Sequence, residues 1–405
     1  MSNEGNNKLS ARECCIVARK IWLCASEQSD LAEVERYYRR ALRAQKTPSK
    51  KDRSRISKKA VGKLVMELSR KEFKDASDKL ALLLCQQGRS HETKRGLEML
   101  GYKCRLSDAV LNYTYPVQPM HRKAGKGCPC VILDDFLSKL QLKLLQKIFS
   151  NTESSYWLDH NYSIEPPSPY FSYAFSLEHV EEYGLLGDLV QRILQLPEVK
   201  EKFPAVKEAK YAEMWAHNRP HASGHQLHFD SDDEGRGDVI KNPIISTVIY
   251  LSDDCGGPSL VTNQPFSSGP SEMTLATHGW LSYPQRGRLV AFDGKLLHGV
   301  IPGKGTAASL ESRRVTLMIA LWKDLKIRIP QHDDTLGGAA RPFPHKGKSQ
   351  WVKEIMTLKK HIRRNTEITI ETKPVPINGI YETLDGSPWT SHHGPMEYDE
   401  VFQGF

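Results

Sequence analysis

Three residues have the types and spacing that hold a non-haem ferrous ion: His228, Asp230 and His298. His228 and Asp230 are two positions apart, so in an extended strand both side chains face the same side. His298 follows Asp230 by 68 residues, at the end of a short apolar run that predicts a buried strand. Two imidazoles and one carboxylate leave open coordination positions on Fe(II), so we expect a ferrous site here.

Other histidines compete for this role, because the chain has fifteen. His221 and His225, with His228, have spacings of four and three that would suit a zinc cluster on a helix. Pro220 and Gly224 disfavour a helix there. We therefore expect no ligand role for His221 or His225.

A second His-x-Asp pattern occurs at His332 and Asp334, with His392 58 residues beyond the aspartate. Neither lysine nor arginine follows His393, so this set lacks a later cation that could bind an anionic ligand beside the metal. The first triad is the preferred metal site.

Residues 313–322 predict a long strand, in which Arg314 and Thr316 share one face and Arg313 lies on the other. A guanidinium offers a planar fork of donors that suits a carboxylate, and a hydroxyl two residues on adds one more donor. We expect Arg314 and Thr316 to bind an anion together.

The order of His-x-Asp, a distal His298 followed by Gly-Val-x-Pro, and Arg-x-Thr resembles the Fe(II)- and 2-oxoglutarate-dependent dioxygenases, most closely their prolyl 4-hydroxylase-like branch. Two further segments resemble that branch, residues 131–138 and residues 248–257. The resemblance covers roughly residues 129 to 325. Jumonji-type relatives typically hold their co-substrate with a lysine from another strand, so Arg314 in the last strand favours the prolyl hydroxylase-like branch.

The resemblance implies that the triad binds Fe(II) and that Arg314 and Thr316 bind the C5 carboxylate of 2-oxoglutarate. It also suggests a tyrosine that donates a hydrogen bond to the co-substrate. Tyr211 is the first candidate and Tyr250 the second, with core packing as the alternative for both. The implied reaction converts 2-oxoglutarate and O2 to succinate and CO2 while a substrate is hydroxylated, with L-ascorbate as the expected reductant for oxidised iron.

The pattern of elements predicts a mainly β fold with flanking helices, of the α+β class. Short strands recur from residue 211 to residue 322, and helices are expected at 138–149, capped by Ser138, and at 178–196. A double-layered jelly-roll barrel accounts for this order. It matches the double-stranded β-helix of the resembled family.

Three regions are expected: residues 1–127, basic and mostly helical; residues 128–330, the dioxygenase domain; and residues 331–405, a partly ordered extension with a helix at 349–363 and a strand at 366–372. Residues 1–79 hold 20 Lys and Arg against 11 Asp and Glu, an excess that equals the net charge of +9 of the whole chain. The basic run 49–59 suits nuclear import or nucleic-acid contact, although a solvated linker is the commoner meaning.

Eight scattered cysteines without a Cys-x-x-Cys pair indicate reduced thiols rather than a zinc or disulfide framework. The polar N-terminus lacks a secretory pattern, and no apolar run reaches the roughly 20 residues that span a bilayer. We expect an intracellular protein of the cytoplasm or nucleus, without a membrane partner. This departs from the collagen-modifying relatives, which work in the endoplasmic reticulum.

Three functions are consistent with the sequence. The first is hydroxylation of a protein or peptide side chain, with prolyl as the first guess by resemblance. The second is oxidation of nucleic acid or a small molecule by the same chemistry, to which the basic N-terminal region would contribute. The third is an interaction scaffold with an idle barrel, which the intact triad disfavours.

Overall fold

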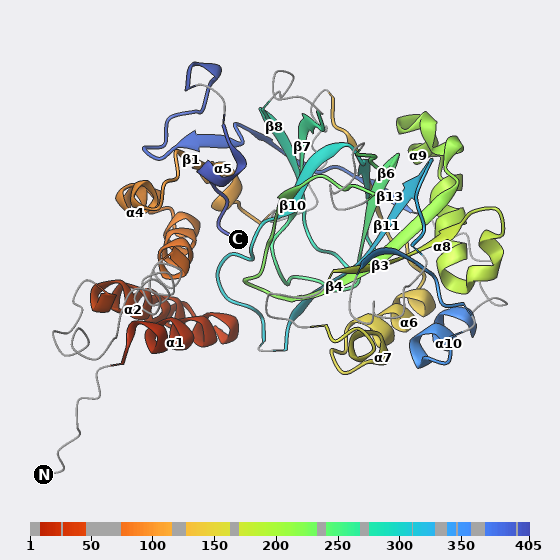
Figure 1. The fold of residues 1–405 in the computed structure, drawn as a ribbon, viewed down its shortest axis with the longest axis horizontal. Helices are drawn as coiled ribbons and strands as arrows, with labels where there is room; N and C mark the ends of the chain where they lie inside the picture. The colour runs from red at the N-terminus through yellow and green to blue at the C-terminus, as the bar shows by residue number, and fades with distance from the viewer. Residues whose placement is uncertain are drawn as a thin grey trace, which may run out of the picture.

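The computed structural model describes residues 9–25, 27–45, 74–115, 127–162, 170–232, 240–267, 275–309, 311–328, 338–345, 347–357, 369–393 and 396–405. Within these ranges the chain forms an eight-stranded, a five-stranded and a three-stranded sheet, with helices outside them (Figure 1). The predicted basic run 49–59 and the second His-x-Asp at 332–334 lie outside the described residues.

The eight-stranded sheet has the order β12-β3-β4-β11-β6-β9-β2-β13. Its strands are β2 (Cys130–Asp134), β3 (Phe171–Ser176), β4 (Tyr211–Pro220), β6 (Ile245–Tyr250), β9 (Leu289–Asp293), β11 (Arg313–Trp322), β12 (Gly338–Pro342) and β13 (Ile370–Thr372). The five-stranded sheet has the order β14-β8-β7-β10-β5, with β5 (His225–His228), β7 (Ser259–Pro265), β8 (His278–Ser282), β10 (Leu296–Val300) and β14 (Val375–Asn378).

The two faces of strand β11 have different surroundings. Alternate apolar residues, Val315 and Leu317 among them, pack into a large core with the helices. The residues between them, such as Thr316 and Met318, face a cavity that the five-stranded sheet also lines. Because side chains of a strand alternate between faces, β11 separates a helix-covered core from the space between the two sheets.

Helices cover the outer face of the eight-stranded sheet, and α6 (Lys139–Phe149) among them has a side-chain cap. The helix α6 begins after Ser138, which forms a capping box with Gln141. It confirms the helix predicted at 138–149. The second predicted helix begins later, because residues 180–183 form a 3-10 turn and Gly184 has a φ of +56°. Beside them lie α7 (Ser155–Leu158), α8 (Gly184–Gln195), α9 (Pro197–Lys202) and α10 (Gln350–Thr357).

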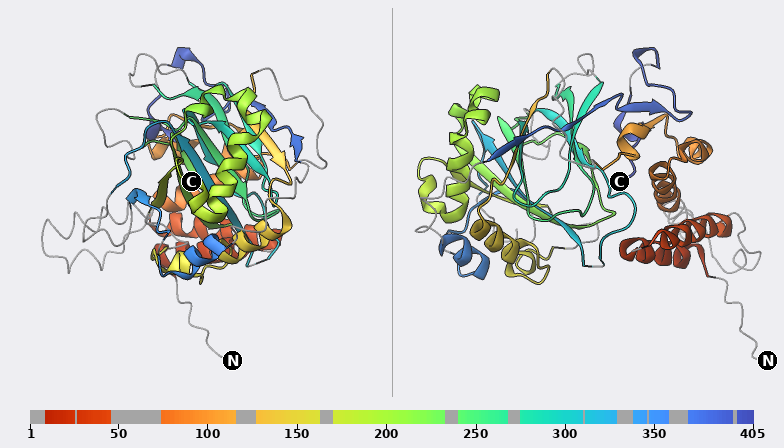
Figure 2. Two further views of the ribbon diagram at one scale, coloured as in Figure 1. Left: turned by 90° about the vertical axis from the view of Figure 1, so that its right-hand side faces the viewer. Right: turned by 180° about the vertical axis from the view of Figure 1, so that it is seen from behind.

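The two ends of the chain pack together on the five-stranded sheet. The short strand β1 (Cys104–Leu106) lies between β15 (Tyr381–Thr383) and β16 (Val401–Phe402). Buried residues of α1 (Ala11–Cys24), α2 (Gln28–Gln45) and the helix at residues 74–86 share one apolar cluster with Leu260 of β7 and Leu297 of β10. Figure 1 and Figure 2 show α1 and α2 on the side of the molecule opposite α6 and α10.

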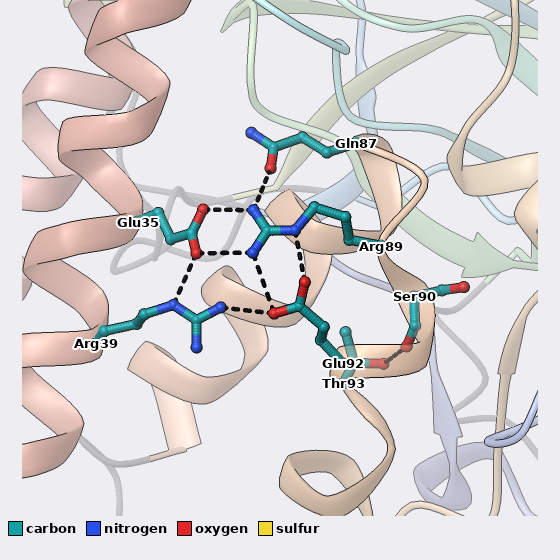
Figure 3. Close-up of polar contacts among 7 residues, drawn as sticks. All are labelled: Glu35, Arg39, Gln87, Arg89, Ser90, Glu92 and Thr93. Atoms are coloured by element: carbon teal, nitrogen blue, oxygen red, sulfur yellow. Dashed lines mark hydrogen bonds and ion pairs between the residues drawn. The ribbon is translucent and has the colours of Figure 1, made fainter.

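An ion-pair network joins α2 to the segment that follows the helix at 74–86 (Figure 3). Glu35 accepts hydrogen bonds from Arg89 Nη1 at 2.7 Å and from Arg39 Nε at 2.7 Å. Glu92 in turn accepts from Arg89 Nε at 2.6 Å and from Arg39 Nη2 at 2.9 Å. Partly exposed pairs of this kind contribute about 0.2–1 kcal/mol each. The apolar cluster beneath them therefore dominates the packing of the N-terminal helices.

Shorter elements complete the described part of the chain. They are α4 (Lys94–Met99), α5 (Asp108–Leu111) and the 3-10 helices at Ser90–Glu92, Val180–Tyr183, Pro204–Glu208, Ser391–His393 and Tyr398–Glu400. In the described residues no helix has the length and apolarity needed to cross a membrane. The cysteines whose side chains are described, at 14, 15, 85, 104, 128, 130 and 255, are free thiols.

Candidate metal centre

His228 and His298 lie directly opposite each other in the antiparallel pair of β5 and β10. The Nε2 atom of each ring is 3.6 Å from the same oxygen of Asp230, Oδ1. One ligand atom from each residue lies within 4.8 Å of the others. Among the residues that the structure describes, this is the one cluster of three or more His, Cys, Asp or Glu side chains that could hold a metal ion.

Each imidazole is oriented by its own strand. His228 Nδ1 is 2.8 Å from the carbonyl oxygen of Gln226, and His298 Nδ1 is 2.9 Å from that of Leu296. A carbonyl oxygen can only accept, so Nδ1 carries the proton in both rings. The Nε2 lone pairs then point at the shared position, as metal ligation requires.

Asp230 is held by residues that the sequence pattern did not reveal. The Ser246 hydroxyl donates to Asp230 Oδ2 at 2.5 Å, and the Asn242 side-chain amide donates to the Asp230 carbonyl at 2.7 Å. The Ser246 bond engages Oδ2 and leaves Oδ1 facing the two histidines, while the Asn242 bond holds the main chain at Asp230. Ser246 comes from β6 of the other sheet, so only the packing of the sheets places it here.

The charges of the triad favour a cation. Burial alone would raise the pKa of Asp230, but His298 and His228 outweigh it and hold that pKa below its usual range. Burial lowers the pKa of His298 to about 4. Burial also opposes protonation of His228, but the negative charge of the neighbouring Asp230 carboxylate raises the pKa overall. A carboxylate that draws a proton to His228 also draws a metal cation to the same point.

A small cavity of about 50 Å³ adjoins the triad and contains Arg314 and Thr316. Arg314 is 4% exposed; its Nε donates to the Gly257 carbonyl at 3.2 Å and its Nη2 to Ser259 Oγ at 2.9 Å. Gly256 has a φ of +76°, and a Cβ there would lie 2.4 Å from Arg314 Cδ. A glycine is therefore required for this arginine to keep its position.

Two buried polar atoms in this cavity have no hydrogen-bond partner: Thr316 Oγ1 and His217 Nδ1. Leaving a buried polar group unsatisfied costs about 1–3 kcal/mol. An anionic ligand seated on Arg314 can accept a hydrogen bond from the Thr316 hydroxyl and remove one of these costs. The donor set thus fits a carboxylate beside a ferrous ion.

The two candidate tyrosines occupy different places. Tyr250 is fully buried, and its hydroxyl lies 2.8 Å from Ser259 Oγ and 3.0 Å from the Ser282 carbonyl oxygen. It therefore supports Arg314 through Ser259, and the guanidinium lies 5.2 Å from its ring centre. Tyr211, ranked first from the sequence, pairs with Trp322 at the far end of β4 and lines neither cavity of the site.

Three other residues considered in the sequence, Arg313, His221 and His225, lie outside the ligand cluster. Arg313 is opposite Pro220 and does not line the small cavity. His221 accepts from the Gly256 amide at 3.0 Å and lies outside the ligand cluster. His225, which also lies outside it, stacks on His228 with ring centres 4.5 Å apart. The sequence offered no reason to expect this stacking.

A larger cavity of about 380 Å³ lies on another side of the triad. It shares His217, His225 and His228 with the small cavity and includes Asp230. Its other walls are mostly aromatic, with one buried carboxyl group: Tyr162, Tyr170, Phe171, Glu213, Trp215, Phe229 and Trp322. The metal position thus has a confined pocket on one side and a roomier chamber on the other.

The structure is similar to several solved structures over about half of the chain. A prolyl-4-hydroxylase from Pseudomonas putida has 14% identity and a TM-score of 0.29, over 48% of this chain and 93% of that one. A viral collagen prolyl hydroxylase from Paramecium Bursaria Chlorella virus-1 has 15% identity and a TM-score of 0.26, over 48% and 96%. HygX from Streptomyces hygroscopicus, solved with iron bound, has 11% identity and a TM-score of 0.27, over 53% and 91%. No family model matches the sequence, and no curated protein sequence matches it.

Proposed function

We propose that this chain is an Fe(II)- and 2-oxoglutarate-dependent dioxygenase of the prolyl 4-hydroxylase-like branch, and that it hydroxylates a protein or peptide side chain. One observation carries the proposal: the ligand atoms of His228, Asp230 and His298 converge beside a cavity that holds a buried arginine and an unsatisfied threonine hydroxyl. In this proposal the two sheets that flank the site form a double-stranded β-helix.

The triad holds Fe(II) through two neutral imidazoles and Asp230 Oδ1. Arg314 and Thr316 bind the C5 carboxylate of 2-oxoglutarate, and Ser259 and Tyr250 keep the guanidinium in place. When bound, Fe(II) and 2-oxoglutarate activate O2 for hydroxylation, and the co-substrate leaves as succinate and CO2. L-ascorbate serves as the reductant that returns oxidised iron to Fe(II).

The protein's own residues confine this chemistry. Burial holds the pKa values of His217 and His225 well below the usual range, so both rings are neutral at physiological pH. They add no charge beside the metal position. Because the two cavities meet at the triad, co-substrate and substrate have separate places, and only the substrate needs the larger chamber.

The test is oxygen transfer. The purified chain is incubated with Fe(II), 2-oxoglutarate, ascorbate and ¹⁸O2 in the presence of a peptide library, and products are analysed by mass spectrometry. The proposal expects one ¹⁸O atom per hydroxylated side chain and one succinate per hydroxyl. The same reaction is run with oligonucleotides or small molecules in place of the peptides. Incorporation of ¹⁸O into one of these, with none into peptide, would overturn the substrate class. Absence of succinate from iron-loaded protein would overturn the reaction.

A further inference from the structure

The larger cavity contains an acidic group that metal binding does not use. Glu213 lies on β4, is 3% exposed and lines the chamber together with Trp215 and Tyr170. In the sheet, Glu213 is opposite Ala320 of β11, and Ser246, the donor to Asp230, is opposite Ala320 on the other side. Glu213 therefore stands two strands away from the serine that anchors the metal-binding carboxylate.

One oxygen of Glu213 is fixed by a hydrogen-bond relay. The Ala340 amide donates to Ser172 Oγ at 2.7 Å, and the Ser172 hydroxyl donates to Glu213 Oε1. Ala340 keeps a φ of +53°, a conformation that non-glycine residues rarely adopt. Because Ser172 uses its only proton in this bond, Oε1 is the acceptor. The side chain of Trp322 and the Ala340 amide also hydrogen-bond to this carboxyl group and oppose the rise of its pKa.

The surroundings of Glu213 favour a cation. Tyr170 and Trp215 lie edge to face with ring centres 6.4 Å apart, and aromatic faces attract ammonium and guanidinium groups. Burial raises the pKa of Glu213 to about 7, although Ser172 opposes the rise. A bound cation would offset the cost of ionising this carboxyl group.

The chamber also has a basic residue, Arg219, which lies far from Glu213 along β4. Arg219 also lines the cavity but pairs with Arg314, six residues along β4 from Glu213. Six residues of strand span about 20 Å. Arg219 therefore lies at the far end of the chamber from Glu213, and Asp230, the other acidic group of the chamber, belongs to the triad.

We propose that the chamber binds the cationic end of a basic side chain, an ammonium or guanidinium group, with Glu213 as its counter-charge and Tyr170 and Trp215 as its walls. This inference rests on the proposed function and names its substrate class: a lysine or arginine side chain of a protein or peptide, in place of the prolyl group expected by resemblance. The carbon chain of such a residue lies beside the metal position while its cationic group pairs with Glu213.

The experiment compares peptides that differ only at the central residue: lysine, arginine, norleucine, proline and glutamate. Succinate formed above the peptide-free background is measured for wild-type protein, Glu213→Gln and the exposed control Glu153→Gln. We expect lysine or arginine to exceed norleucine in kcat/KM by about tenfold or more, because a buried charge-assisted contact is at stake. Glu213→Gln should lose this preference, and Glu153→Gln should keep it.

The outcomes separate the two proposals. Wild-type preference for norleucine or proline, or a cation preference that survives Glu213→Gln, overturns the inference and leaves the oxygenase reaction standing. No succinate from iron-loaded wild-type protein, with or without peptide, overturns the proposed function and this inference with it. The Fe(II) affinity of Glu213→Gln shows whether the metal site of this variant is intact. The preference of the wild-type protein among the five peptides tests the inference even if the variant does not fold.

Discussion

His228 and His298 face each other across two strands, and each donates its Nδ1 proton to the carbonyl oxygen two residues before it in its own strand. The same local contact therefore sets both tautomers. Register then brings the two Nε2 atoms to equal distances from one oxygen of Asp230. A ligand set with fixed proton positions needs little reorganisation when a metal binds.

Arg314 is expected to anchor the co-substrate, and Arg313 is its matched control. Removing one partner of a buried charge-assisted pair costs about 2–5 kcal/mol, or roughly 30-fold and more in affinity. Arg314→Ala should raise the 2-oxoglutarate concentration needed for half-maximal succinate formation by that range, and Arg313→Ala should change it little. A larger effect at Arg313 would contradict the observed strand register.

Thr316→Val should have opposite effects on stability and on co-substrate binding. The Thr316 hydroxyl is buried without a partner, so the valine should leave the ligand-free protein equally or more stable. Loss of its hydrogen bond should weaken 2-oxoglutarate binding by about 3- to 10-fold. Thr262→Val is the control, since its buried hydroxyl donates to the Leu297 carbonyl at 2.8 Å and its loss should destabilise the fold. Thermal unfolding measures both effects on stability. Equal destabilisation in Thr316→Val and Thr262→Val would show that the Thr316 hydroxyl already has a hydrogen-bond partner in the ligand-free protein.

Glu213 should make the stability of the metal-free protein depend on pH. Its pKa is raised from 4.5 to about 7, so the folded state binds its proton more tightly than the unfolded state. This contribution is fully present below pH 4.5 and is lost as the pH rises through 7, with a total of up to about 3 kcal/mol. Urea unfolding at pH 5 and pH 8 should show a smaller loss in Glu213→Gln than in wild type. An identical loss in the two proteins would place the titrating group elsewhere.

The N-terminal helices are expected to unfold together with the two large sheets. Leu82 is fully buried in the apolar cluster that joins both ends of the chain to the five-stranded sheet, and it packs against the backbone at Gly404. Leu82→Ala should cost about 2–5 kcal/mol. Leu140→Ala, at a helical site 52% exposed, should cost far less. Separate transitions for the helices and the sheets, followed by circular dichroism and tryptophan fluorescence, would instead indicate independent domains.

Strand alternation explains what the sequence could predict. It assigned Arg314 and Thr316 to one face, and the structure places both in one cavity. Alternation gives the face of a residue but not its depth, so Tyr211 shares a face with His217 yet lies six residues away at the end of β4. Ser246 and Ser172 reach the site only through pairing between distant strands, which a sequence pattern does not specify. The insertion of β1 between β15 and β16 was hidden for the same reason.

The most direct test of the metal centre measures Fe(II) binding and 2-oxoglutarate-dependent succinate formation in wild-type protein, His298→Ala and the exposed control His179→Ala. Removing one of two imidazoles should abolish both properties in His298→Ala, because the cluster then offers only His228 and Asp230. His179→Ala should match wild type. Succinate formation retained by His298→Ala would contradict the assignment of His228, Asp230 and His298 as the iron ligands.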